Sequence, residues 1–145
     1  MQQAAAFEQV RGDVEVLLRE AKANDLNVAI DRKLNSIFDP DDAMKVQTRD
    51  DCVVGIGKDL VKYDAIDTGT FVCPLEFFAY LDRSKRDGDC SLADGVRAMA
   101  IEGKVRAIDI GDAWWQDIDT PEMLAAAEKL AAGLDRLDRP GPAAP

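Results

Sequence analysis

The sequence predicts an α/β fold in which a mixed sheet is flanked by helices. Two observations support this fold class: helical and strand patterns alternate along the chain, and several short strand patterns follow one another in its centre. The 145 residues are 47% hydrophobic and 32% charged, which fits one globular domain with a moderate core. We expect that domain over residues 1–137, followed by a disordered tail over residues 138–145.

The first part of the chain is expected to contain one helix and then strands. Apolar residues recur every three or four positions over 7–23, which predicts an amphipathic helix. Short apolar runs predict strands over 26–30, 45–48 and 52–57. The Asp- and Pro-rich stretch 39–42 predicts a turn between the first two of these strands.

The middle of the chain is expected to continue with a strand over 65–72 and a helix from Pro74 to about residue 83. A loop over 87–89 separates that helix from the next one. Ser91 is a good N-cap for the second helix, and Asp94 three residues later completes a capping-box variant.

The last part of the chain is expected to contain two strands and a helix. Strand patterns cover 105–110 and 114–118. The run Thr120-Pro121-Glu122 places an N-cap residue, a first-turn proline and an acid at the positive end of a helix dipole. We expect this helix to end near residue 137.

Charge and composition exclude several classes of function. The net charge of −10 argues against nonspecific binding to nucleic acid or to anionic membranes, which need basic surfaces. No apolar run approaches the ~20 residues of a membrane span, and no secretory signal is visible, so we expect a cytoplasmic location. The absence of histidine excludes Ser-His-Asp and Cys-His catalysis. The negative charge has two explanations. It serves only to keep the chain soluble, or some of its carboxylates also bind a divalent cation.

Asp117 and Asp119 are candidate metal ligands. In an extended chain their side chains share one face, with α-carbons about 6.5 Å apart. Two carboxylates in this arrangement can hold Mg²⁺ directly or through its waters. The alternative is that Asp119 and Thr120 cap the last helix and that Asp117 is a surface residue.

A second candidate region follows the strand over 52–57. Lys58 comes directly after a glycine that ends this strand, where it can meet an anion. Asp67 interrupts an apolar strand, where an unpaired carboxylate is costly, and Gly69 leaves its backbone open to a ligand. The alternative is that Lys58 is an ordinary loop lysine and that Asp67 is an edge residue.

These stretches resemble, in the same order, the second half of the nucleotidyltransferases that join CTP or another NTP to a phosphorylated alcohol. They are most similar to the inositol-1-phosphate cytidylyltransferases, which are often fused to a membrane phosphotransferase of inositol-phospholipid synthesis. The likeness covers roughly residues 25–132. Its most specific parts are Asp67-Thr68-Gly69 and the stretch from Trp115 to Thr120; further matching stretches are 26–34, 41–46, 56–60, 63–66 and 91–96.

The resemblance implies a GT-A-like, Rossmann-like fold and a set of site residues. Lys58 stands where such enzymes place a catalytic lysine that binds the acceptor's phosphate, and Asp67, Thr68 and Gly69 stand where they line the acceptor pocket. Asp119, together with Asp117, stands where they hold Mg²⁺. Met44 departs from the threonine expected between Ala43 and Lys45, which weakens any role for that loop.

The resemblance also implies that the N-terminal nucleotide-binding half is absent, because the sequence has neither the Gly-rich, Arg-containing loop nor the aspartate that follows it in the family. The complete enzyme would transfer a nucleotidyl group, cytidylyl by resemblance, from an NTP to a phosphorylated polyol or sugar such as inositol 1-phosphate, releasing pyrophosphate. The chain alone is expected to be inactive, with the missing half or further copies of itself as partners. The alternatives are a non-catalytic polyol-phosphate-binding or regulatory domain, and a fragment that only packs against another subunit. We also expect an unpaired sheet edge with an exposed apolar surface.

Overall fold

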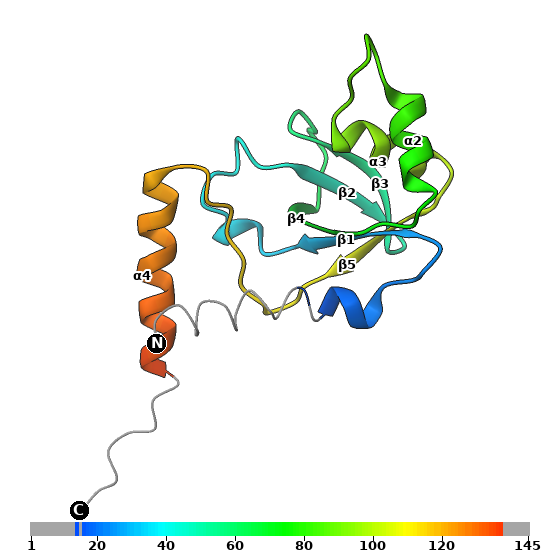
Figure 1. Cartoon of the computed structure of the whole chain (residues 1–145). Helices are drawn as coiled ribbons and strands as arrows, with labels where there is room; N and C mark the ends of the chain where they lie inside the picture. Colours follow the sequence, from blue (N-terminus) through cyan, green and yellow to red (C-terminus); the bar gives the residue numbers. More distant parts are fainter. Residues whose placement is uncertain (1–13, 15, 138–145) are drawn as a thin grey trace, which may run out of the picture.

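A computed structural model describes residues 14 and 16–137, and in this part of the chain five strands close into a barrel in the order β1-β4-β2-β3-β5 (Figure 1). The strands are β1 (Leu26–Asp31), β2 (Lys45–Arg49), β3 (Cys52–Gly57), β4 (Ala65–Val72) and β5 (Val105–Asp109). The helices are the short η1 (Leu34–Ser36), α2 (Phe77–Ser84), α3 (Leu92–Ile101) and α4 (Pro121–Leu137).

The sheet is mixed, as the sequence predicts. β1 and β5 run parallel, whereas the other pairs are antiparallel. Each of the five described strands has a partner on both sides, so the expectation of an unpaired edge is wrong for this part of the chain. The closure between β3 and β5 is narrow: it consists of the pair Cys52 and Arg106, supported by a 2.8 Å hydrogen bond from the Ala107 amide to the Asp51 carbonyl.

The main core lies between the barrel and the pair α2–α3. Alternate residues of β1 point into it, and the buried side chains of α2 and α3 cover it. The two helices approach closely at Gly95, where an added Cβ would lie 2.5 Å from Leu81 Cδ2 and 3.0 Å from Phe77 Cε2. The helix α3 begins as predicted, because Ser91 and Asp94 exchange side-chain and backbone hydrogen bonds in a complete capping box.

A smaller core lies on the other face of β1. Leu17 packs there with Ala29, Ile108 and Ile110. Residues 14 and 16–20 are helical, which agrees with the C-terminal part of the expected first helix. The remainder of that helix, and the expected tail over 138–145, lie outside the described residues.

The strand expected over 114–118 is wrong: residues 113–119 have no regular secondary structure. A strand needs a free neighbour, and β1, whose last residue Asp31 contacts this segment through Trp115, is already paired with β4 on one side and β5 on the other. The segment instead leads to α4, which lies on the opposite side of the barrel from α2 and α3 (Figure 1). Thr120 caps α4 by accepting a 3.2 Å hydrogen bond from the Met123 amide.

No described helix combines the length and the apolar character that crossing a membrane requires.

Candidate functional site

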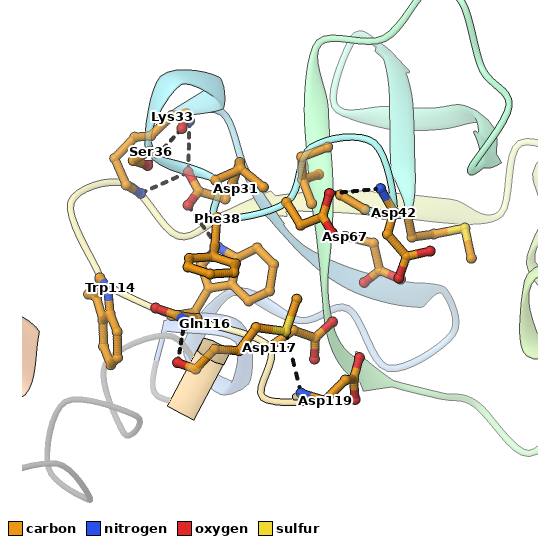
Figure 2. Close-up of a pocket in the computed structure, with 17 residues that line it drawn as sticks. Asp31, Lys33, Ser36, Phe38, Asp42, Asp67, Trp114, Gln116, Asp117 and Asp119 are labelled. Carbon is orange, nitrogen blue, oxygen red and sulfur yellow. Dashed lines mark hydrogen bonds and ion pairs between the residues drawn. The ribbon is translucent and has the colours of Figure 1, made fainter. Parts of the chain in front are cut away.

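A pocket of about 70 Å³ lies where β1 and β4 meet the loop around η1 and the segment before α4 (Figure 2). Carboxylates dominate its polar lining, and Phe38 and two tryptophans contribute apolar surface. The carboxylates belong to Asp31, Asp39, Asp42, Asp67, Asp117 and Asp119. The pocket therefore gathers side chains from four separate segments, including three of the residues predicted from the sequence.

Asp67 places its carboxyl group in this pocket from the middle of β4. Burial raises the pKa of this group to about 6, and the nearby charge of Asp117 adds to the shift. The Gly69 amide partly offsets the increase by donating a 2.7 Å hydrogen bond to Asp67 Oδ1. Asp67 is therefore a half-buried acid that is ready to accept or donate hydrogen bonds near neutral pH.

Asp117 and Asp119 both line the pocket from the irregular segment before α4. Partial burial raises the pKa of the Asp117 carboxyl, and repulsion by Asp119 and Asp42 raises it further. In the described part of the chain, neither carboxylate makes a hydrogen bond or an ion pair. Because Thr120 supplies the helix cap, the carboxylate of Asp119 is left available to a ligand.

Lys58 lies beside the pocket and outside its wall, where its Nζ forms a 2.5 Å ion pair with Asp42 Oδ1. The hydrogen bond to Asp42 raises the pKa of Lys58, and the charges of Asp119 and Asp117 raise it further. Lys45 Nζ holds the backbone of this turn through a 2.6 Å hydrogen bond to the Lys58 carbonyl. Lys58 is thus a cation within the electrostatic reach of the acidic pair.

The other two predicted substrate-binding residues do not line the pocket. The Thr68 side chain is buried and donates a 3.1 Å hydrogen bond to the Ala29 carbonyl. Gly69 has a φ of 80°, a conformation that favours glycine, and it contributes through its amide to Asp67. In this structure both residues support the position of Asp67, and their direct contact with a substrate stays a prediction.

Asp31, Asp42 and Trp115 lie in stretches that carry the resemblance, but the sequence analysis assigned none of them a role at the site. Asp31 is 2% exposed and accepts a 2.7 Å hydrogen bond from Trp115 Nε1, whereas Asp42 holds Lys58. A carboxylate that ends an otherwise apolar strand was the available signal for Asp31, and it is the same signal that identified Asp67.

The donor set fits Mg²⁺ only as part of a larger site. Among residues 14 and 16–137, no three acidic or thiol side chains come together to hold a metal ion. Mg²⁺ is commonly held by one or two carboxylates, with waters and substrate phosphate oxygens as the remaining ligands. The pair Asp117 and Asp119 matches this pattern, and a cation between them would relieve the repulsion that raises the Asp117 pKa.

Comparisons with known proteins show what the chain is similar to. The chain is 34% identical over 105 residues to the Bifunctional IPC transferase and DIPP synthase of Rubrobacter xylanophilus, covering 72% of this chain and 24% of that protein. It is 36% identical over 91 residues to the protein of the same name from Thermococcus kodakarensis, covering 61% and 20%. The solved structure of the inositol-1-phosphate CTP transferase from T. maritima matches with a TM-score of 0.70 and 25% identity, covering 86% and 51%. No family model matches the chain.

These matches confirm the predicted resemblance to nucleotidyltransferases of the inositol-1-phosphate cytidylyltransferase kind, and they confirm the α/β fold class. The chain spans between a fifth and a quarter of the length of these curated relatives and about half of the solved structure.

Proposed function

We propose that this chain, which is similar to part of the inositol-1-phosphate cytidylyltransferases, forms the acceptor- and metal-binding part of a nucleotidyltransferase. The complete enzyme transfers a cytidylyl group from CTP to a phosphorylated polyol such as inositol 1-phosphate and releases pyrophosphate. The observation that carries the proposal is the joint lining of one pocket by Asp67, Asp117 and Asp119, with Lys58 beside it.

Each group has a chemical role in this reaction. Asp67 is half-buried and offers oxygen atoms that hydrogen-bond polyol hydroxyl groups. Lys58 exchanges its ion pair with Asp42 for one with the acceptor's phosphate, which carries more charge than a carboxylate. The two ends of a phosphorylated polyol are therefore recognised by groups of opposite character.

The reaction forms a bond between an oxygen of the acceptor's phosphate and the α-phosphorus of CTP, and it breaks the α–β anhydride bond. The acceptor phosphate has a second pKa of about 6, so it is largely dianionic at neutral pH and needs no general base. This chemistry suits a chain without histidine, because positioning and charge neutralisation supply the catalysis. When bound by Asp117 and Asp119, Mg²⁺ supplies neutralisation of the phosphate charge.

The size of the pocket bears on what the chain does alone. A volume of about 70 Å³ is well below the roughly 300–1,000 Å³ of typical small-molecule sites. The acceptor can therefore be only partly enclosed by the described residues, and other protein surface must supply the remaining walls. The second candidate is a polyol-phosphate-binding domain without catalysis of its own, in which Asp67 and Lys58 bind the ligand and no nucleotide is used.

Replacement of Asp119 by asparagine tests the proposal. In the protein supplied with the nucleotide-binding half, Asp119→Asn should lower the rate of CTP-dependent pyrophosphate release by about 10²- to 10³-fold, because the amide keeps the carboxylate's shape and loses its charge. Asp82→Asn is the matched control, since Asp82 is an exposed aspartate of α2 outside the pocket. It should retain the activity of the unaltered protein.

Near-full activity of Asp119→Asn with an unchanged Mg²⁺ requirement would contradict the assignment. If calorimetry detects binding of inositol 1-phosphate that requires Asp67 and Lys58, yet no transfer occurs with the nucleotide-binding half present, the non-catalytic candidate is correct.

A further inference from the structure

Asp31 is the most deeply buried carboxylate of the described residues, and both of its oxygens are engaged. Oδ1 accepts a 2.7 Å hydrogen bond from the Lys33 amide and forms a 2.8 Å ion pair with Lys33 Nζ. Oδ2 accepts a 2.7 Å hydrogen bond from Trp115 Nε1. A buried charge is tolerated only when it is paired and hydrogen-bonded in this way. Asp31 therefore needs both Lys33 and Trp115 as partners.

Lys33 extends the same arrangement to the chain that follows β5. Its Nζ donates a 2.5 Å hydrogen bond to the Gly111 carbonyl, at the start of the segment that carries the acidic pair. Asp31 and Lys33 lie side by side at the pocket (Figure 2). Together they bind this segment at two points, at Gly111 through Lys33 and at Trp115 directly through Asp31. We call Asp31, Lys33 and Trp115 the clamp, and residues 111–119 the carboxylate loop.

The carboxylate loop has few other connections to the barrel. Gln116 Nε2 donates a 2.9 Å hydrogen bond to the Met123 carbonyl, and the Asp119 amide lies 3.5 Å from Met123 Sδ, so both of these contacts go to α4. Within residues 14 and 16–137, the bond from Trp115 to Asp31 is the only hydrogen bond that joins residues 114–119 to the barrel. The Trp115 ring also packs against the smaller core around Leu17.

The position of the acidic pair relative to Asp67 therefore depends on the clamp. Asp67 is fixed by the strand ladder of β4, whereas Asp117 and Asp119 belong to a loop without such a ladder. Asp117 follows Trp115 by two residues, so a displacement of the backbone at Trp115 also displaces the backbone at Asp117. The clamp is the connection that brings the two halves of the pocket to a fixed separation.

We propose that Asp31 is a positioning residue which, through Trp115 and Lys33, holds Asp117 and Asp119 in place to bind a divalent cation opposite Asp67. This inference rests on the proposed function for the identity of the ligand. It assigns Asp31 no contact with the substrate, and its effect passes entirely through the carboxylate loop.

Terbium binding tests the proposal on the 145-residue chain. Trp114 and Trp115 neighbour the acidic pair in the sequence, so Tb³⁺ bound there is sensitised by tryptophan excitation. Asp31→Asn keeps the shape of the side chain, and Trp115→Phe keeps an aromatic ring but removes the N–H donor. Each should raise the Tb³⁺ concentration at half-saturation about tenfold, as expected for loss of a group that orients a metal ligand.

Asp82→Asn is the matched control, because it removes the acidic partner of the exposed ion pair with Lys85 far from the pocket. It should leave the Tb³⁺ titration unchanged. A residue that only stabilised the fold would lower the melting temperature without changing this titration at a temperature where the variant is folded. Unchanged Tb³⁺ binding in both clamp variants, with Asp119→Asn weakened, would overturn the proposal.

A second measurement separates failure of the clamp from failure of the proposed function. If Asp119→Asn binds Tb³⁺ as tightly as the unaltered chain, the cation role of the acidic pair is wrong. The clamp is then judged from amide hydrogen exchange of residues 112–119 and of the Trp115 indole, measured by NMR on the ¹⁵N-labelled chain. Exchange at least about tenfold faster in Asp31→Asn than in Asp82→Asn supports positioning, and equal exchange overturns it.

Discussion

The α2–α3 side of the barrel and the pocket side differ in how their polar groups are satisfied. On the α2–α3 side, Asp94 bonds to Ser91 and Arg97, and the hydrogen bond from Ser91 is the main cause that holds the Asp94 pKa well below its usual range. On the pocket side, six carboxylates gather, while Asp67 and Asp117 have raised pKa values. The α2–α3 side uses the charge of Asp94 to stabilise the fold, whereas the pocket side holds Asp67 and Asp117 in an environment that disfavours their charged form and that a bound ligand could improve.

The two sides of the barrel therefore serve different purposes: the α2–α3 side contributes stability, and the pocket side is suited to ligand binding. Lowered pKa values mark carboxylates that the folded chain stabilises in their charged form, whereas raised values mark carboxylates that it destabilises. Substitutions on the α2–α3 side should therefore cost stability and leave ligand binding intact. Substitutions of Asp67 and Asp117, the two pocket acids with raised pKa values, should do the reverse.

The largest effect is expected from Gly95→Val. An added Cβ would lie 2.5 Å from Leu81 Cδ2 and 3.0 Å from the buried Phe77 ring, so α2 and α3 would have to separate. We expect a loss of about 3 kcal/mol in the free energy of unfolding, measured by urea denaturation. Gly133→Ala is the control, because Gly133 of α4 has no atom within 4 Å of its added Cβ, and it should gain up to about 1 kcal/mol. If the two substitutions changed the free energy of unfolding equally, close packing of α2 against α3 would not be the source of stability on this side.

Asp67→Asn should have the opposite sign. The folded-state pKa of about 6 exceeds the unfolded value of about 3.9, so the folded chain binds more protons between these values and wild-type stability falls as pH rises through this window. The substitution removes that loss and should stabilise the chain by roughly 2 kcal/mol at pH 7, with little change at pH 3.5.

Urea denaturation of both proteins between pH 3.5 and pH 7.5 measures this difference. Only the difference between the two curves is assigned to Asp67, because the net charge of −10 gives both proteins a pH dependence of their own. A variant that is less stable than the unaltered chain at pH 7 would mean that the Asp67 charge is stabilised in the folded state.

The smallest effect is expected from Ser91→Ala. The substitution removes the hydroxyl that accepts a 3.1 Å hydrogen bond from the Asp94 amide at the start of α3. Loss of such a cap should lower the free energy of unfolding by about 1 kcal/mol. Ser91→Asp, which keeps an acceptor at the cap, should recover part of this loss if repulsion with Asp94 is modest. A pocket-side readout such as Tb³⁺ binding should not change in either variant.

Much of the fold could be predicted because its signals are local. The strands β3 and β4 have the bounds that the sequence predicts. The Ser91 capping box of α3 and the Thr120 cap of α4 also form as predicted. The candidate site was partly predicted for a similar reason, since a carboxylate inside an apolar strand identifies Asp67 without knowledge of its neighbours. Lys58 was located beside the site, but its ion pair with Asp42 spans 16 positions and has no local signal.

Local patterns in the sequence placed the five strands and the starts of α3 and α4, and they identified Asp67, Asp117 and Asp119 as candidates for chemistry. The closing of the strands into a barrel depends on tertiary contacts, and it leaves residues 113–119 without a strand partner despite their strand-like pattern. The contact between Asp31 and Trp115, which are 84 positions apart, depends on tertiary structure as well. The spacing of apolar residues and the capping of helices depend on residues a few positions apart, so they can be recognised in the sequence. Strand pairing and the burial of a charged side chain depend instead on which distant segments of the chain lie beside it.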